Sequence, residues 1–363
     1  MNRKWEICKN NKEQIEKLVK ESNLSSLLAS ILINRNITTL QEVELFLNPT
    51  RNDFHNPFLM PDMEMAVNRI LKAISNQEKV IIYGDYDVDG ITSITVLKKF
   101  LSERGLLVGQ YTPNRLSEGY GLNKNAVKKI YEQGYTLIIT VDCGISGNEE
   151  IEYATQLGME VIVTDHHEPA EEIPKCIAVV DAKRKDSEYP FNQLAGVGVV
   201  FKLIQAISIR MKLDEKEYLK YLDIVCVGTI SDIVPLINEN RVIAKLGLKL
   251  IPMTKNIGLK TLIQSVGYQN IDSTSISFGI APRINACGRM GFQEEALKLL
   301  LTDSKEEAYK ITEILNKYNL ERQETEKEIF DQAIKQIEKS ETDEPCIVLG
   351  KEGWHHGVIG IVS

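Results

Sequence analysis

Three aspartates, Asp85, Asp87 and Asp89, stand at alternate positions directly after the apolar run at residues 80–83, and apolar sequence resumes at Ile91. This order predicts a strand, then a loop, then a helix. The acids could cap an ordinary turn, because aspartate accepts hydrogen bonds from nearby backbone amides. They could equally hold a cation or border a phosphate site, although the stretch lacks the later glutamate of an EF-hand. This stretch alone leaves both interpretations open.

Two later apolar runs also end in residues that bind metals. Residues 137–141 are followed by Asp142, and residues 160–164 are followed by an Asp-His-His triplet at 165–167. A single aspartate at a strand end is usually a helix N-cap. In a parallel sheet, however, the carboxyl ends of the strands lie at one edge, where ligands bind. Carboxylates gathered there repel one another unless cations neutralise them, so the pattern predicts a metal site.

The donor types indicate which metal this site would take. Carboxylate oxygens with one or two imidazoles, and without thiolate, favour Mn²⁺, with Mg²⁺ as a substitute. This many acids would suit two ions that share one carboxylate, and Asp142 is the predicted bridge because its strand should be central in the sheet. Two ions about 3.5–4 Å apart can activate a water and stabilise a leaving oxygen in phosphoryl chemistry. Asp232 is a further candidate within the apolar residues 228–236, with a helix cap near Pro235 as the alternative.

Length and composition limit the classes of protein that fit. The chain has 363 residues, a formal charge of −8 and 26% charged residues, which suits a globular protein of more than one domain. No apolar run approaches the length of a membrane span, and the N-terminus is charged rather than secretory. Six scattered cysteines without a CxxC pair fit a cytoplasmic protein with reduced thiols. The net charge argues mildly against a protein coated with nucleic acid, although bound cations would offset part of it.

Apolar periodicity predicts the architecture. Helices are expected first, at residues 12–21, 24–34, 39–47 and 63–75. Five apolar, β-branched runs then alternate with helical segments, at residues 80–83, 106–111, 137–141, 160–164 and 177–180. We therefore expect an α/β fold with a doubly wound, Rossmann-like parallel sheet. There is no GxGxxG, and Gly196 and Gly198 indicate a tight helix start rather than a nucleotide site.

The second half of the chain reads as helical. Helices are expected at residues 198–211, 217–230, 240–251 and 258–266. A long segment at residues 305–339 has dense Glu and Lys, which predicts a solvated connecting helix. After it, residues 345–350 are typical of the first strand of a new unit.

Four blocks of sequence identify a family. GDYDVDG at 84–90, VDCG at 141–144, TDHH at 164–167 and GTISDIVPL at 228–236 resemble the successive motifs of the DHH phosphoesterase superfamily. The triplet Asp165, His166 and His167 gives that superfamily its name. Three further stretches, at 113–122, 282–290 and 353–361, are most similar to its single-strand-specific exonucleases. Together the blocks cover nearly the whole chain.

The resemblance implies residue roles that the residues alone leave open. By it, five residues match metal ligands: Asp87, Asp89, Asp142, His166 and Asp232. Two match adjacent catalytic or second-layer positions: Asp85 and His167. Three arginines fall in motifs that hold DNA phosphate: Arg115, Arg283 and Arg289. Guanidinium groups suit phosphate oxygens, although a lone arginine is otherwise usually a surface residue.

The resemblance also implies an activity, namely Mn²⁺-dependent hydrolysis of single-stranded DNA from 5′ to 3′ in repair and recombination. A helicase or a single-strand-binding protein would be a partner. One alternative is a relative acting on short oligonucleotides, cyclic dinucleotides or pyrophosphate; such relatives typically have a histidine before the acidic pair, where this chain has Tyr83-Gly84-Asp85. Another is a non-catalytic DNA-binding scaffold, which should have lost acids that this chain keeps.

The expected division of the chain follows from the same blocks. Residues 1–77 would form an N-terminal helical region, 78–300 the DHH phosphoesterase domain and 301–340 the connecting helix. Residues 341–363 would begin a DHH-associated domain that the chain does not complete.

Overall fold

A parallel sheet organises the computed structural model, which describes residues 4, 6, 11–340 and 346–363. Its five strands run in the order β2-β1-β3-β4-β5, and every neighbouring pair is parallel. The strands are β1 (Lys79–Gly84), β2 (Leu107–Tyr111), β3 (Leu137–Val141), β4 (Glu160–Thr164) and β5 (Ala178–Val180). All five lie where the apolar runs predicted them, so the doubly wound α/β fold is confirmed.

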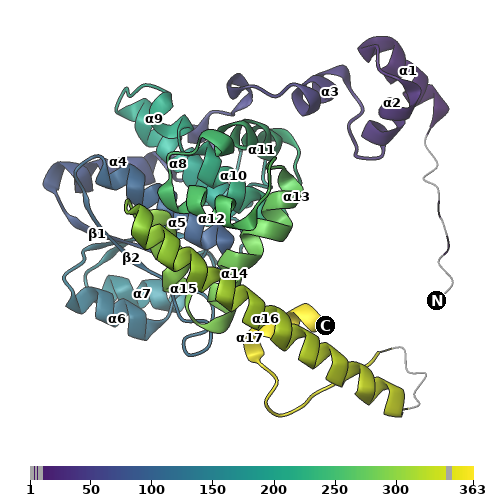
Figure 1. The fold of residues 1–363 in the computed structure, drawn as a ribbon. Coiled ribbons are helices and arrows are strands. Elements are labelled where there is room, and N and C mark those ends of the chain that lie inside the picture. Colours follow the sequence, from purple (N-terminus) through teal and green to yellow (C-terminus); the bar gives the residue numbers. More distant parts are fainter. Residues whose placement is uncertain (1–3, 5, 7–10, 341–345) are drawn as a thin grey trace.

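Helices cover both faces of the sheet (Figure 1). One face is packed by α4 (Met63–Asn76), α5 (Val88–Ser102) and α8 (Gly196–Arg210). The other is packed by α6 (Lys124–Glu132) and α7 (Asn148–Gln156). Burial on both faces explains why the strands are continuous apolar runs rather than alternating ones.

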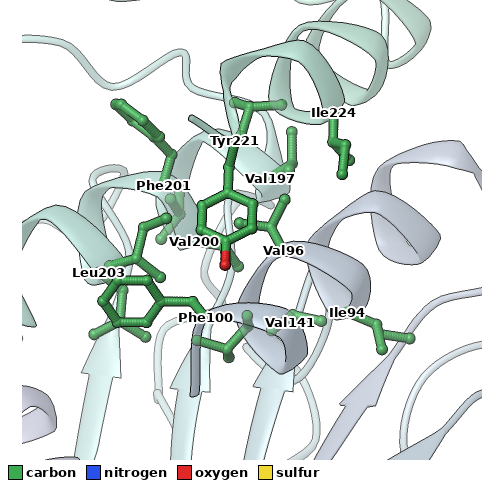
Figure 2. Close-up of a cluster of buried hydrophobic side chains, with 14 of the residues drawn as sticks. Ile94, Val96, Phe100, Val141, Val197, Val200, Phe201, Leu203, Tyr221 and Ile224 are labelled. Atoms are coloured by element: carbon green, nitrogen blue, oxygen red, sulfur yellow. The ribbon is translucent and has the colours of Figure 1, made fainter. Parts of the chain in front are cut away.

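Successive residues of a strand enter different cores. Ile82 on β1 belongs to the larger core with Phe100 on α5, whereas Ile81 belongs to the smaller core beneath α6 and α7. Figure 2 shows part of the larger core, where Phe100 lies near Leu203 of α8 and Tyr221. Removing a ring this deeply buried would cost about 3–5 kcal/mol. These cores fix the strand ends that position the predicted site.

The second half of the chain is helical, as expected, with different boundaries. The helix expected at residues 217–230 is two helices, α9 (Lys216–Leu219) and α10 (Leu222–Ser231). Then come α11 (Asn238–Leu250) and α12 (Ile257–Val266). A further set was not predicted, because glycines and Pro282 obscure its periodicity: α13 (Ser273–Ser275), the π-helical turn η4 (Ile276–Ile280), α14 (Ala281–Met290) and α15 (Gln293–Leu301).

Three N-terminal helices form a small unit of their own at the periphery (Figure 1). They are α1 (Lys12–Ser22), α2 (Ser26–Ile33) and α3 (Leu40–Leu47). Leu18, Leu32 and Val43 make their core. A reciprocal capping box between Thr39 and Glu42 fixes the start of α3. Two 3₁₀ turns, η1 (Arg51–Asp53) and η2 (Pro57–Leu59), connect this unit to α4.

The long helix α16 (Lys305–Ser340) is confirmed, but its first half is not simply solvated. Ala308 and Leu315 are buried and belong to the larger core. The strand expected at residues 345–350 is wrong for residues 346–350, which pair with no described strand, and residue 345 lies outside the described residues. The short helix α17 (His356–Val362) packs against α16 instead. Among the described helices, none has the length and apolar character needed to cross a membrane.

The sheet order creates one special position at the strand ends. From β1 the chain adds β2 on one side, and β3, β4 and β5 then extend the sheet on the other side. The direction of winding therefore reverses between β1 and β3, and open α/β sheets bind ligands beyond the carboxyl ends at such a point.

Candidate metal centre

The loop after β1 delivers the first three acids. Asp85 and Asp87 lie in this loop, and Asp89 lies in the first turn of α5, which begins at Val88, before the apolar sequence resumes at Ile91. The earlier start follows from Asp87, whose carboxylate caps the helix by accepting a hydrogen bond from the Gly90 amide at 3.0 Å. A Cβ atom at Gly90 would overlap the main chain of Asp85. The tight turn therefore brings all three carboxylates to the end of β1.

Asp142 and His166 come from the next two strands. Asp142 directly follows β3 in the left-handed conformation, with φ 57°, which aspartate tolerates better than most residues. His166 follows β4, and its Nε2 lies 3.0 Å from Asp142 Oδ1. A Cβ atom at Gly196 would lie 2.7 Å from Asp142 Oδ1. Glycine is thus needed where α8 approaches the centre, in agreement with the tight helix start that the sequence indicated.

The start of α8 also holds Asp89. Its Oδ2 accepts a hydrogen bond from the Gly196 amide at 2.6 Å, and its Oδ1 accepts one from the Val197 amide at 2.8 Å. The positive end of a helix dipole stabilises a carboxylate in this place. Asp232, the last residue of the set, caps the C-terminal end of α10. Asp89 Oδ2 and Asp232 Oδ2 each lie 3.7 Å from a ring nitrogen of His166.

The candidate ligand atoms form three overlapping groups, each with its atoms within 4.8 Å of one another. The groups are Asp85 with Asp87 and Asp142, Asp142 with His166 and His167, and Asp89 with His166 and Asp232. Asp142 and His166 each belong to two groups. The structure thus brings together all seven residues predicted for this centre, and a shared position for Asp142 agrees with the geometry. Their individual roles as ligands stay predictions.

Four carboxylates of this centre are largely buried beside one another, and the nearby Arg115, His167 and Lys183 offset their repulsion only in part; they are those of Asp85, Asp89, Asp142 and Asp232. Burial, followed by repulsion from Asp87, raises the pKa of Asp85 to about 7 and the pKa of Asp232 to about 7. Burial and the neighbouring acids also hold the pKa values of Asp89 and Asp142 well above the usual range. Bound cations would relieve this repulsion and keep the acids ionised.

His166 strengthens the case for a cation. Burial, and then the nearby His167, lowers the pKa of His166 to about 4, so its ring is neutral and has one N–H. Carboxylates nevertheless face both of its ring nitrogens, and only one of those nitrogens carries a proton. The lone pair of the other nitrogen is therefore directed at a carboxylate. Within the described residues, Asp85 Oδ1 and Asp232 Oδ2 are buried and accept no hydrogen bond. An oxygen and nitrogen donor set of this kind fits Mn²⁺ or Mg²⁺.

Asp165 and Tyr120 hold His167 in place. The sequence analysis counted Asp165 only among the strand-end candidates for metal binding, and it did not single out Tyr120. Asp165 Oδ1 accepts a hydrogen bond from His167 Nδ1 at 2.6 Å, and Asp165 Oδ2 accepts one from the Ile145 amide at 2.8 Å. Although burial raises the pKa of Asp165, the hydrogen bond from His167 and those from backbone amides bring it below the usual value. His167 Nε2 lies 3.4 Å from the Tyr120 hydroxyl. The signal available in the sequence was an aspartate two residues before a histidine at a strand end.

The three predicted arginines have different surroundings. Arg115 lies over the ring of Tyr86, 5.3 Å from its centroid, beside the acid loop. Arg289 donates to the Gly357 carbonyl oxygen at 3.1 Å, and burial, then Arg115 and Arg322, lower its pKa because the guanidinium groups repel one another. Arg283 instead donates to the Gly279 carbonyl and to Asn316 Oδ1, both at 2.6 Å. The structure therefore groups Arg115 with Arg289, and it uses Arg283 to join α14 to α16.

Comparison with known proteins decides the family. The model of the DHH family, N-terminal domain, matches residues 79–229. A curated relative, the single-stranded-DNA-specific exonuclease RecJ of Bacillus subtilis (strain 168), is 41% identical over 362 residues, which cover 99% of this chain. The chain belongs to the DHH family. It spans 45% of the length of that relative, so it corresponds to less than half of the longer protein.

Solved structures of DHH-family exonucleases agree with this fold. A structure of exonuclease RecJ bound to manganese matches with a TM-score of 0.76 and 36% identity, over 84% of this chain and 76% of that one. RecJ of Thermus thermophilus in complex with Mn²⁺ matches with a TM-score of 0.82 and 30% identity, over 97% of this chain and 50% of that one. The same Thermus protein in complex with Mg²⁺ gives a TM-score of 0.74 and 29% identity, over 97% of this chain and 48% of that one. These relatives bind the two metals that the donor set predicted.

Proposed function

We propose that the chain forms the hydrolytic part of a metal-dependent exonuclease that cleaves phosphodiester bonds in single-stranded DNA from the 5′ end. The observation that carries this proposal is the buried acidic centre, in which Asp142 and His166 each belong to two of the three ligand groups. The name of the Bacillus subtilis relative, a single-stranded-DNA-specific exonuclease, supports DNA as the substrate. The 5′ to 3′ direction, a place in repair and recombination, and a helicase or single-strand-binding protein as partner come from the family resemblance.

Five side chains are proposed to hold two Mn²⁺ ions, or Mg²⁺ in their place: Asp87, Asp89, Asp142, His166 and Asp232. Asp142 would contact both ions. Cations in this place supply Lewis-acid chemistry, because they neutralise charge on the phosphate and lower the pKa of water. The backbone amides of Gly196 and Val197 orient Asp89 for this task.

Asp85 and His167 are proposed to act on the substrate and the attacking water. His167 Nδ1 donates to Asp165, so its Nε2 faces the open side of the centre toward Tyr120. A proton can be held or released at that nitrogen. Arg115 and Arg289 are proposed to bind flanking phosphates, since guanidinium groups pair with phosphate oxygens through two hydrogen bonds.

The proposed division of the chain keeps the expected boundaries for residues 1–77, 78–300 and 301–340. The separate small core of α1, α2 and α3 supports the first. A cytoplasmic location is proposed because the substrate is DNA, and all five described cysteines are free thiols.

One assay tests the proposed function. The purified chain with Mn²⁺ is incubated separately with 5′-phosphorylated single-stranded DNA, duplex DNA, a cyclic dinucleotide and pyrophosphate. We expect mononucleotides from the single strand alone, and none when Asp142→Ala protein from the same preparation replaces the parent. Turnover of only the cyclic dinucleotide or pyrophosphate would replace this proposal with a small-substrate phosphodiesterase.

A further inference from the structure

An exposed apolar side chain directly follows the centre on strained backbone. Ile233 comes after Asp232, has φ 63°, and its side chain is 88% exposed. A β-branched residue rarely adopts this left-handed conformation, because its branched Cβ crowds the backbone. Backbone outliers of this kind gather at functional sites, where the surrounding structure holds them in place. The exposure and the backbone conformation of Ile233 therefore point to a functional role for this residue.

A second exposed apolar side chain lies on a rare kind of helix. Phe278 is the middle residue of η4, the π-helical turn, and is 76% exposed. Ile276 and Ile280, at the two ends of the same turn, are fully buried. Such π turns are uncommon and are frequent at functional sites. The turn is thus anchored in the core while its aromatic ring points to solvent.

Ile233 and Phe278 line the same groove. The groove has a volume of about 510 Å³ and is also lined by Arg289 and Arg322, on α14 and α16. Asn285 forms part of its wall and accepts a hydrogen bond from the Val88 amide at 3.1 Å, which attaches α14 to the first turn of α5. Since α5 begins directly after the acid loop, the groove adjoins the metal centre.

The groove therefore combines two properties that a nucleotide also combines. Arg289 offers positive charge, and because Arg115 and Arg322 repel its guanidinium, a bound anion would relieve that repulsion. Arg322 itself is paired with Glu326 of the same groove at 2.6 Å. Ile233 and Phe278 expose apolar side chains to water. A single-stranded nucleic acid presents an anionic phosphate and an apolar base face within one nucleotide, whereas a duplex keeps the faces of its bases stacked inside.

We propose that Ile233 and Phe278 form an apolar lip that packs against an unpaired nucleobase of the substrate, while Arg289 of the groove holds its phosphate. This inference rests on the proposed function and adds the feature by which the chain selects unpaired strands. The other occupant that an apolar surface could take is a protein segment. That alternative would leave the affinity for DNA independent of its bases.

Binding to two matched oligonucleotides tests the lip. One is a fluorescent 5′-phosphorylated strand of thymidylates, and the other has the same length and charge but abasic sugars throughout. Dissociation constants are measured by anisotropy with Ca²⁺ in place of Mn²⁺. We expect Phe278→Ala to weaken binding of the thymidylate strand between about 5-fold and 100-fold, the range expected for one lost stacking contact. The affinity of the Phe278→Ala protein for the abasic strand should change less than twofold. Ile233→Ala should act in the same direction with a smaller effect.

Control variants distinguish an effect of the lip from a loss of folding, and failure of the lip from failure of the proposed exonuclease function. Tyr309→Ala removes an exposed aromatic ring on α16 that does not line the groove, and it should leave both affinities unchanged. Phe278→Leu keeps apolar bulk and should lose less than Phe278→Ala. Equal losses on both strands, or no loss on either, would overturn the lip while leaving the exonuclease standing. A parent protein that binds neither strand would overturn both.

Discussion

Two clusters of this chain bury ionisable side chains, and they differ in how those charges are neutralised. In the first, Lys202 and Glu239 are both fully buried, and Lys202 Nζ donates to Glu239 Oε1 at 2.9 Å and to the His55 carbonyl at 2.7 Å. The Tyr189 hydroxyl and the His55 amide donate to the same glutamate at 2.5 and 3.0 Å. In the second, the metal centre, buried carboxylates face one another and a neutral histidine.

The difference shows how a structural charge cluster is told apart from a ligand site. The Lys202–Glu239 cluster is complete, because each charge meets an opposite charge and the remaining polar atoms are hydrogen-bonded. In the metal centre, the pKa values of Asp89 and Asp142 are raised, and Asp85 Oδ1 and Asp232 Oδ2 accept no hydrogen bond from the residues that the structure describes. A buried charge without a partner costs several kcal/mol, so the centre is explained by the cations that it is built to bind.

The largest effect is expected from the residue shared by two ligand groups. Asp142→Ala should lower hydrolysis by about 10³-fold or more, because stabilisation of the charged phosphate would be lost. It should also weaken Mn²⁺ binding more than Asp85→Ala does. Calorimetric titration with Mn²⁺ measures the second part. Asp223→Asn is the matched control, since Asp223 is a buried acid bonded to Thr254 away from the centre. Equal Mn²⁺ stoichiometry in Asp142→Ala and the parent would rule out the proposal that Asp142 contacts both ions.

The complete cluster should respond to single mutations with loss of stability. Lys202→Met leaves Glu239 buried without its cation and is expected to lower the free energy of unfolding by about 3–5 kcal/mol. The double variant with Glu239→Gln should lose less, because no buried charge then remains unpaired. Urea unfolding of the three proteins measures this. A loss below about 1 kcal/mol for the single variant would mean that the two clusters do not differ as described.

The pH dependence of stability should separate the clusters more finely. In the metal-free protein, Asp85 has a pKa of about 7 against an ordinary value of 3.8, so the folded state binds more protons than the unfolded state between those values. This contribution to stability is complete below about pH 4 and is lost as the pH rises through 7. Each such group changes the unfolding free energy by up to about 1.4 kcal/mol per pH unit.

The measurement compares the parent with Asp85→Asn by urea unfolding between pH 5 and 8 in a metal chelator. The parent should lose stability relative to the variant as the pH rises, and saturating Mn²⁺ should abolish that relative loss because cations favour the ionised acids. Identical pH profiles for the two proteins would show that the pKa of Asp85 is not raised in the folded state.

The smallest effect is expected from the arginines around the centre. Arg115→Ala should weaken binding of single-stranded DNA a few-fold and reduce the salt dependence of the affinity by about 0.7, the value for one phosphate contact on a single strand. Mn²⁺ occupancy should not change. Arg283→Ala is the matched variant, and it should keep the parental slope, because its guanidinium binds Gly279 and Asn316. A reduced slope for Arg283→Ala alone would reverse these assignments.

What could be predicted from the sequence follows from what its local patterns encode. The five strands were found because burial on both faces makes each one a continuous apolar run. The centre was found because acids and imidazoles follow three of those strands. Other features depend on contacts across the chain: the hydrogen bonds from Gly196 and Val197 to Asp89, and the attachment of Arg283 to α16. The π-helical turn was also out of reach, since no periodicity marks a single turn of this kind.

The most direct test of the metal centre is anomalous X-ray scattering at the manganese edge, from crystals of this chain grown with Mn²⁺. The account predicts two peaks at the carboxyl ends of β1, β3 and β4, both within bonding distance of the Asp142 carboxylate. A single peak that does not contact Asp142, or manganese bound only elsewhere on the chain, would contradict it.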